Sequence, residues 1–239
     1  MYFLGHMAWA YVFAALTWAL IPVIKNKGRL VIPFVLLAGT LSDSDLLLGG
    51  LGIVHRTVTH SFLFWIVAFL PLFVIFRWKS IPYFAAVIQH FAFGDLLVGP
   101  VGIFWPFSAS KVGFSFAMGS AVDVAFEIAG LLLALGIMFC IGDLKRILSS
   151  RKENILMLLP FLALLVSALY FIASRRSLGA LTTFLFSSNS QIALVAGHLI
   201  LVALIGASLF QGLRAFKRDR LSKKRKIRPL LHKSKGESA

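Results

Sequence analysis

Long runs of apolar residues are the feature that most limits how this 239-residue chain can fold. A helix needs about 20 consecutive apolar residues to cross the hydrocarbon core of a bilayer. Seven runs approach that length: roughly 7–24, 30–48, 59–76, 80–99, 121–141, 154–173 and 191–211. With 59% hydrophobic residues, the chain has more apolar sequence than one soluble core can bury. We therefore predict an all-α, polytopic membrane protein with about seven transmembrane helices.

The distribution of basic residues predicts how these helices are oriented. Loops rich in Lys and Arg face the cytoplasm. If the seven helices alternate in direction, 20 of the 24 Lys and Arg residues fall on the side that carries the C-terminal tail. Those on the other side are Arg56, Lys111, Arg175 and Arg176. We expect an N-terminus outside and a C-terminus in the cytoplasm, in the cytoplasmic (inner) membrane of a prokaryote.

The tail, residues 214–239, carries eleven of the basic residues and much of the net charge of +15. The run Lys223-Lys224-Arg225-Lys226 is typical of nucleic-acid binding, but neither a folded reader domain nor interleaved aromatic residues accompany it. Contact with anionic lipids, or a simple topological anchor, explains the tail better. We expect a disordered tail and no nucleic-acid partner.

Nine ionisable residues map near the outer face in this topology: His6, Asp43, Asp45, His55, His60, His90, Asp95, Asp123 and Glu127. Such groups are costly in or beside hydrocarbon, so their gathering at one surface predicts a functional site. Imidazole and carboxylate groups bind divalent metals where thiolates are lacking. The sole cysteine, Cys140, cannot form a thiolate cluster. We predict a divalent metal site, with Zn²⁺ favoured over Mg²⁺ or Mn²⁺ and the number of ions left open.

Simpler explanations exist for single members of this group. Asp123 alone could be a helix cap, and Asp43-Ser44-Asp45 could be turn chemistry. We interpret His198, a lone histidine in the last apolar run, as a hydrogen-bonded core residue. Nine ionisable residues at one surface are harder to explain in this way.

An apolar segment broken by Pro and Gly, residues 99–108, follows the fourth run. It is too short and too interrupted to span a bilayer. We expect it to lie at the interface or to re-enter the membrane and cover the site. The alternative is an ordinary interfacial loop anchored by Trp105.

Several short motifs occur in a fixed order in the first half of the chain. They are Gly5-His6, then Asp43-Ser44-Asp45, then His55-Arg56-Thr57-Val58-Thr59-His60-Ser61, then His90, and then Trp105-Pro106. Together they resemble the YdjM-like family of membrane-bound, predicted metal-dependent hydrolases, over about residues 1–130. That family is distantly similar to zinc-dependent phospholipases C and single-strand nucleases, all-helical phosphoesterases with several metals held by His and Asp. The likeness suggests Asp123 and Glu127 as the counterpart of a helical His-x-x-x-Glu pair.

The chain departs from the family pattern at several positions. Leu41-Ser42 replaces the residue pair before the first Asp, Leu46 stands in place of a His, and Thr57 in place of a Gly. His90 and Asp95 are five residues apart instead of four, which leaves their side chains about 140° apart on an ideal helix. A single π-bulge around Gly94 would return both to one face, and such bulges favour functional sites.

The leading hypothesis is a membrane-bound phosphoester hydrolase that acts on a lipid or lipid-linked substrate at the outer membrane face. The metal would activate a water molecule, Asp45 would take the proton from that water, and Arg56 would bind a phosphate oxygen. Arg56 could instead be a solvated charge or the partner of an Asp.

The main alternative is a cation or proton-coupled transporter that uses the same His and Asp cluster. A transporter needs a polar path to the other face, yet the predicted spans place no acidic or His residue in their cytoplasmic halves. A membrane scaffold that acts through its basic tail would leave the outer cluster unexplained. We expect a hydrolase core at residues 1–130, further transmembrane helices at 131–213 and the tail at 214–239.

Overall fold

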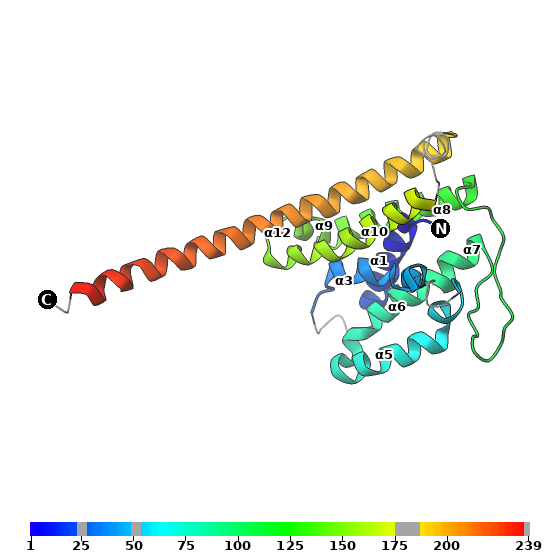
Figure 1. Cartoon of the computed structure of the whole chain (residues 1–239), viewed down its shortest axis with the longest axis horizontal. Coiled ribbons are helices and arrows are strands. Elements are labelled where there is room, and N and C mark those ends of the chain that lie inside the picture. Colours follow the sequence, from blue (N-terminus) through cyan, green and yellow to red (C-terminus); the bar gives the residue numbers. More distant parts are fainter. Residues whose placement is uncertain (23–27, 49–53, 175–186, 237–239) are drawn as a thin grey trace.

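The computed structural model describes residues 1–22, 28–48, 54–174 and 187–236, and the regular elements in this part of the chain are all helices (Figure 1). An isolated antiparallel bridge pairs Val101 with Val112 in the loop before α8. The elements are α1 (Phe3–Leu20), α3 (Ile32–Ala38), η1 (Leu41–Ser44), α4 (Asp45–Leu48), η3 (Val58–His60), α5 (Phe62–Phe76), η4 (Arg77–Ser80), α6 (Ile81–Gln89), η5 (His90–Asp95), α7 (Leu96–Val98), α8 (Ala121–Cys140), α9 (Asp143–Ile147), η6 (Lys152–Met157), α10 (Leu158–Ser174) and α12 (Asn189–Gly236).

Five helical segments are long and apolar enough to cross a membrane in the described part of the chain: Phe3–Leu20, Phe62–Val98, Ala121–Cys140, Lys152–Tyr170 and Asn189–Leu221. The second of them contains two of the predicted spans. It reverses direction at η4, where Arg77 has a positive φ of 52°. Its arms pack against each other, and the rings of Phe69 and Phe84 lie 5.1 Å apart.

The predicted span at residues 30–48 is not a single helix. Helix α3 has seven residues, and the chain then continues through η1 into α4. The polar residues Thr40, Ser42 and Asp43 follow Gly39 at the end of α3, and η1 brings Asp43 to the other polar groups of the bundle. The total of seven spans and the orientation of the termini stay predictions.

Helix α1 lies at the centre of the bundle and packs against α3, α6 and α8. Small residues allow the close approach: a Cβ on Gly39 would lie 2.6 Å from the Cβ of Ala10 and from the carbonyl oxygen of His6. The outer face of α5 is apolar and exposed, with Val74 at 74% and Ile75 at 68%. An exposed apolar face of this kind is suited to lipid contact.

Our prediction of a disordered tail differs from the structure, in which α12 continues as a helix to Gly236. Lys, Arg and Leu favour the helical state, and a helix already nucleated by packing extends at little cost. In Figure 1 this helix projects well beyond the other elements.

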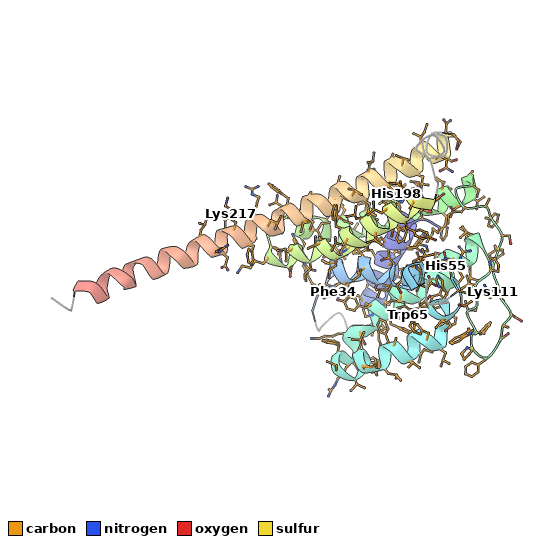
Figure 2. All side chains as sticks on the ribbon, in the orientation of Figure 1. Phe34, His55, Trp65, Lys111, His198 and Lys217 are labelled. Atoms are coloured by element: carbon orange, nitrogen blue, oxygen red, sulfur yellow. The ribbon has the colours of Figure 1, made fainter. Side chains whose placement is uncertain are left out.

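The bundle has two chemically different ends. The site end holds the start of α1, η1, η3, η5 and the start of α8. The basic end holds η4, α9, η6 and the part of α12 around Lys217. In Figure 2, His55 and Lys111 lie on the opposite side of the bundle from Lys217.

Candidate metal centre

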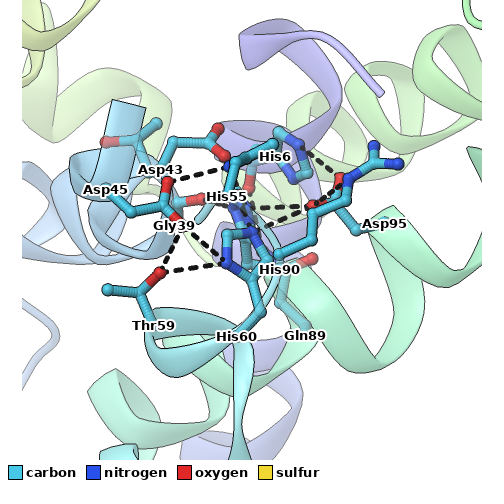
Figure 3. A network of polar contacts seen from close by, with 12 residues as sticks. His6, Gly39, Asp43, Asp45, His55, Thr59, His60, Gln89, His90 and Asp95 are labelled. Carbon is cyan, nitrogen blue, oxygen red and sulfur yellow. Dashed lines mark hydrogen bonds and ion pairs between the residues drawn. The ribbon is translucent and has the colours of Figure 1, made fainter. Parts of the chain in front are cut away.

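Four side chains from three separate elements meet at the site end: Asp43 of η1, His60 of η3, and His90 and Asp95 of η5. One ligand atom from each lies within 4.8 Å of the other three. His60 Nε2 is 3.1 Å from Asp95 Oδ2, and His90 Nε2 is 3.2 Å from Asp43 Oδ1 (Figure 3). Two imidazole nitrogens and two carboxylate oxygens form a donor set that suits Zn²⁺ or another divalent ion.

Three atoms of this group are buried and have no hydrogen-bond partner among the described residues: His60 Nε2, His90 Nε2 and Asp95 Oδ2. They lie close together, with Asp95 Oδ2 3.1 Å from His60 Nε2 and 3.7 Å from His90 Nε2. A buried polar atom without a partner is uncommon in proteins and calls for an explanation. A bound cation would satisfy all three, so the residues present fit a metal ion.

The predicted π-bulge is confirmed, because η5 is a π-helix from His90 to Asp95. The wider turn brings both side chains to one face, with His90 Nε2 3.7 Å from Asp95 Oδ2. Gly94 permits this turn to pack on α1, since a Cβ there would lie 3.1 Å from the ring of His6.

Hydrogen bonds orient the two central histidines. His90 Nδ1 lies 2.7 Å from the carbonyl oxygen of Gly39, which can only accept, so Nδ1 carries the proton and Nε2 presents a lone pair. His60 Nδ1 lies 3.3 Å from Asp45 Oδ2 and 3.1 Å from Thr59 Oγ1. Metal-binding histidines are commonly fixed in this way by a carbonyl or carboxylate behind the ring.

Asp45 lies behind His60 and contacts His55 as well. Its Oδ1 is 2.8 Å from His55 Nδ1, and its Oδ2 accepts a hydrogen bond of 2.6 Å from the Thr59 hydroxyl. Asp45, His55 and His60 make up a second group of ligand atoms within reach of a metal ion. His55 is the most open member, with 36% of its side chain exposed.

His6 and Arg56 both contact Asp95. His6 Nε2 is 3.5 Å from Asp95 Oδ1, and its ring stacks on His90 with the centroids 3.7 Å apart. Arg56 Nε is 3.5 Å from Asp95 Oδ2, which agrees with the alternative of an Asp partner. Its backbone has a positive φ of 62°, an uncommon conformation for a residue other than glycine.

The loop expected to cover the site is tied to the histidine motif. Gly102 N donates to the carbonyl oxygen of Arg56 at 3.0 Å, and Phe62 N donates to that of Ile103 at 3.1 Å. Aromatic side chains of this loop are exposed, including Phe107 at 84%. The loop therefore fixes the position of Arg56 and presents an apolar outer surface.

Charge within the cluster is strongly coupled. Burial raises the pKa of Asp43, but the imidazoles of His90 and His60 outweigh it and hold that pKa well below its usual range. Burial also opposes ionisation of Asp45, yet hydrogen bonds from His55, His60 and Thr59 lower its pKa. Burial lowers the pKa of His60, but the carboxylates of Asp43, Asp45 and Asp95 raise it to about 10. The carboxylates of Asp43 and Asp45 are thus ionised, and a metal ion bound at His60 Nε2 would displace the proton that this raised pKa keeps on the imidazole.

Asp123 and Glu127 lie elsewhere. Glu127 accepts hydrogen bonds from the backbone N–H groups of Tyr2 at 2.5 Å and Gly5 at 3.1 Å, at the start of α1. Asp123 accepts one from Gly119 N at 2.8 Å. The spacing placed both correctly on one face of α8, but that face holds the N-terminal segment instead of joining either group of ligand atoms.

A cavity of about 350 Å³ opens beside the cluster. Its polar wall includes His6, Asp43, His55, Arg56 and Asp95. Its apolar wall comes from α10 and α12, with Leu164, Ala168, Leu194, Val195 and Leu199. His198 also lines it, and its Nδ1 lies 2.9 Å from the carbonyl oxygen of Leu194, as expected for a hydrogen-bonded histidine.

Sequence reasoning missed one buried charged group, at the basic end. Tyr11 donates a hydrogen bond of 3.0 Å to Asp143 Oδ2, and Arg146 Nη1 lies 3.7 Å from Asp143 Oδ1. Tyr11 is hidden in an apolar run and Asp143 follows one, so no local pattern links them. Buried Met7, Ala8 and Ala10 of α1 lie between this group and His6 along the chain.

The comparisons with known proteins identify the family. No curated protein and no solved structure matches the chain. A model of the YdjM inner membrane protein family matches residues 1–177, which extends past the 1–130 expected from the motifs. With apolar helices of membrane-spanning length and a match over most of its sequence, the chain belongs to the YdjM inner membrane protein family.

Proposed function

We propose that this protein is a metal-dependent hydrolase of phosphoesters, with a lipid or lipid-linked substrate at the outer face of the membrane. The observation that carries the proposal is the convergence of His60 Nε2, His90 Nε2 and Asp95 Oδ2, all buried and all without hydrogen-bond partners among the described residues. These residues and Asp43 would hold the ion. A divalent ion bound there would polarise a phosphoryl oxygen of the substrate and lower the pKa of a bound water.

His55 is better placed than Asp45 to take the proton from that water. Both oxygens of Asp45 already contact donors, and Asp45 is almost fully buried. His55 lines the cavity and has its Nδ1 held by Asp45, an arrangement that fixes the ring for general-base catalysis. We assign the proton transfer to His55 and a positioning role to Asp45.

Arg56 is assigned to the substrate phosphate. Its Nε faces Asp95, and the guanidinium has further N–H groups beyond it that suit a phosphate oxygen. The side chain lines the cavity and is 20% exposed. Its contact with Asp95 would keep the charge beside the ion even before substrate binds.

The apolar wall of the cavity favours a lipid substrate. Leu164 and Leu194 are buried, and Leu199 is exposed at the outer surface of α12. A phosphate at the polar wall would thus have room for an acyl or prenyl chain along α10 and α12. A cavity of this size suits a small ligand or part of a larger one.

A transporter is less well supported, because the described residues of α1 do not continue the polar cluster to the basic end. The next buried polar group along α1 is Tyr11, which is closed by its contact with Asp143. An ion path would need polar groups between the two, where α1 has buried apolar residues.

The test uses purified protein in detergent, where no gradient exists to drive transport. We expect at least about one bound divalent ion per chain. We also expect release of phosphate or a phosphorylated headgroup from a phospholipid or polyprenyl phosphate. His55→Ala should keep the ion in the four-residue group and lower turnover by about 10²–10⁴-fold. Glu153→Gln, at the exposed basic end, is the control and should change neither.

If a broad substrate screen shows no turnover while proteoliposomes show metal-dependent cation flux, the protein is a transporter. If His55→Ala loses ions as well as turnover, His55 is a ligand and the assignment of the base is wrong.

A further inference from the structure

A second large cavity opens toward the basic end and has no lining residue in common with the cavity beside the metal centre. It measures about 540 Å³ and is bounded by residues of α1, α3, α5 and α6. Its walls are apolar and include Phe34, Leu37, Phe69, Leu72 and Phe76. Phe34 and Leu72 are partly exposed, at 42% and 39%, so the cavity borders the outer surface of the bundle. An apolar hollow on that surface has the character of a binding site for a hydrocarbon chain.

Two cations line the same cavity, Arg29 and Lys79, and both are exposed. In the described part of the chain, neither forms an ion pair with an acidic side chain. Their neighbours at the basic end differ: Arg146 pairs with Asp143 and Glu153, Arg151 with Glu153, and Lys152 with Asp219. The cavity is therefore lined by two cations whose charge no described acidic side chain matches.

Aromatic side chains hold the backbone beside Arg29. Trp18 Nε1 donates to the carbonyl oxygen of Gly28 at 2.8 Å, and Val31 N donates to the hydroxyl of Tyr83 at 2.9 Å. Trp18 and Tyr83 also line the cavity. Trp and Tyr favour the headgroup level of a membrane, which places Arg29 where a lipid phosphate would lie.

We propose that this cavity binds an anionic phospholipid, with an acyl chain against the apolar walls and the headgroup phosphate between Arg29 and Lys79. Net negative charge distinguishes this ligand from a zwitterionic lipid, whose own cation would offset the attraction to two unpaired basic groups. The site is separate from the metal centre and does not depend on the proposed hydrolase activity.

The experiment measures lipid binding to the detergent-solubilised full chain by native mass spectrometry. The probes are phosphatidylglycerol, phosphatidylcholine with the same acyl chains, and inorganic phosphate. We expect phosphatidylglycerol to bind most tightly, and the double variant Arg29→Gln/Lys79→Gln to weaken it about tenfold without changing phosphatidylcholine. The matched control is Arg151→Gln/Lys152→Gln, which removes the same charge from paired residues and should leave phosphatidylglycerol binding unchanged.

A second variant tests the cavity with both cations intact. Leu72→Trp adds volume at a partly exposed wall and should weaken both lipids. Equal binding of the two lipids by the native protein, or native phosphatidylglycerol binding by the Arg29→Gln/Lys79→Gln variant, would overturn the proposal. Inorganic phosphate that competes with phosphatidylglycerol at similar concentration would show an anion site without a chain site, and would also overturn it.

Discussion

Asp95 at the site end and Asp143 at the basic end are both buried carboxylates, with 2% and 4% exposure. Asp143 has its partners in the protein, because Tyr11 donates to one oxygen and Arg146 lies beside the other. Asp95 Oδ2 also lies 3.5 Å from a cation, at Arg56 Nε, but it and the neighbouring Nε2 atoms of His60 and His90 have no hydrogen bond among the described residues. Leaving a buried acceptor unsatisfied costs about 1–3 kcal/mol. Burial alone therefore does not distinguish a functional carboxylate in this bundle. The distinguishing feature is a buried oxygen that has no hydrogen bond.

The same contrast separates the two ends as wholes. At the basic end, Arg146, Arg151 and Lys152 pair with acidic side chains of the protein, whereas the histidines and carboxylates at the site end are mostly buried and converge on one point. The site end therefore has groups of ligand atoms that could hold a metal ion, and the described residues of the basic end form no such group.

The largest effect is expected from a test of topology. If the two ends face opposite sides of the membrane, a cysteine at one end should be labelled from outside the cell and a cysteine at the other end should not. In a Cys140→Ser background, Val54→Cys at the site end should react with an impermeant maleimide on intact cells. Lys152→Cys at the basic end should react only after the membrane is opened. Both positions are exposed, so accessibility to water is matched. Equal labelling of the two would place both ends on one side and break the comparison.

Loss of metal is the next largest effect. His60→Ala removes a ligand atom and also the ring that Asp43, Asp45 and Asp95 surround, so the metal content of purified protein should fall to background in elemental analysis. Asp143→Asn changes an equally buried carboxylate at the other end and should keep its metal. If the two variants bind metal equally, a missing hydrogen-bond partner is not a sign of ligation in this protein.

An intermediate effect is expected from Asp45→Asn. Asp45 contacts His60 from behind, and loss of such a carboxylate typically costs about 10–100-fold in metal affinity or activity. Competition with a fluorescent chelator measures that affinity directly. If Asp45→Asn keeps native metal affinity and loses about 10²–10⁴-fold in turnover, Asp45 is itself the general base.

Hydropathy and charge were sufficient to predict the helical membrane fold and to place six of the site residues near one another: Asp43, Asp45, His55, His60, His90 and Asp95. His90 and Asp95 are five residues apart instead of the four of the family pattern, so they could share a face only if the helix had a π-bulge, and the structure has a π-helix there. These inferences succeed since they depend on local geometry and on the cost of polar groups in hydrocarbon.

Other features depend on tertiary contacts that no local pattern contains. Asp123 and Glu127 share a helical face, but sequence does not say that the start of α1 packs against it. His6 was expected as a ligand, and the structure places it beside the four-residue group, with its Nε2 3.5 Å from Asp95 Oδ1. The break in the span at residues 30–48 follows from where α3 meets α1 at Gly39.

The smallest effect is expected at the basic end, from Tyr11→Phe. This change removes the hydroxyl that donates to Asp143 and keeps the aromatic ring in place. One hydrogen bond to a charged group contributes about 1.5–3 kcal/mol, and Arg146 still neutralises the carboxylate, so thermal unfolding in detergent should shift only modestly. Metal content should not change, because buried apolar residues of α1 separate Tyr11 from His6. A loss of metal in Tyr11→Phe would show that the two buried groups are coupled through α1, and the basic end could then no longer be treated as complete by itself.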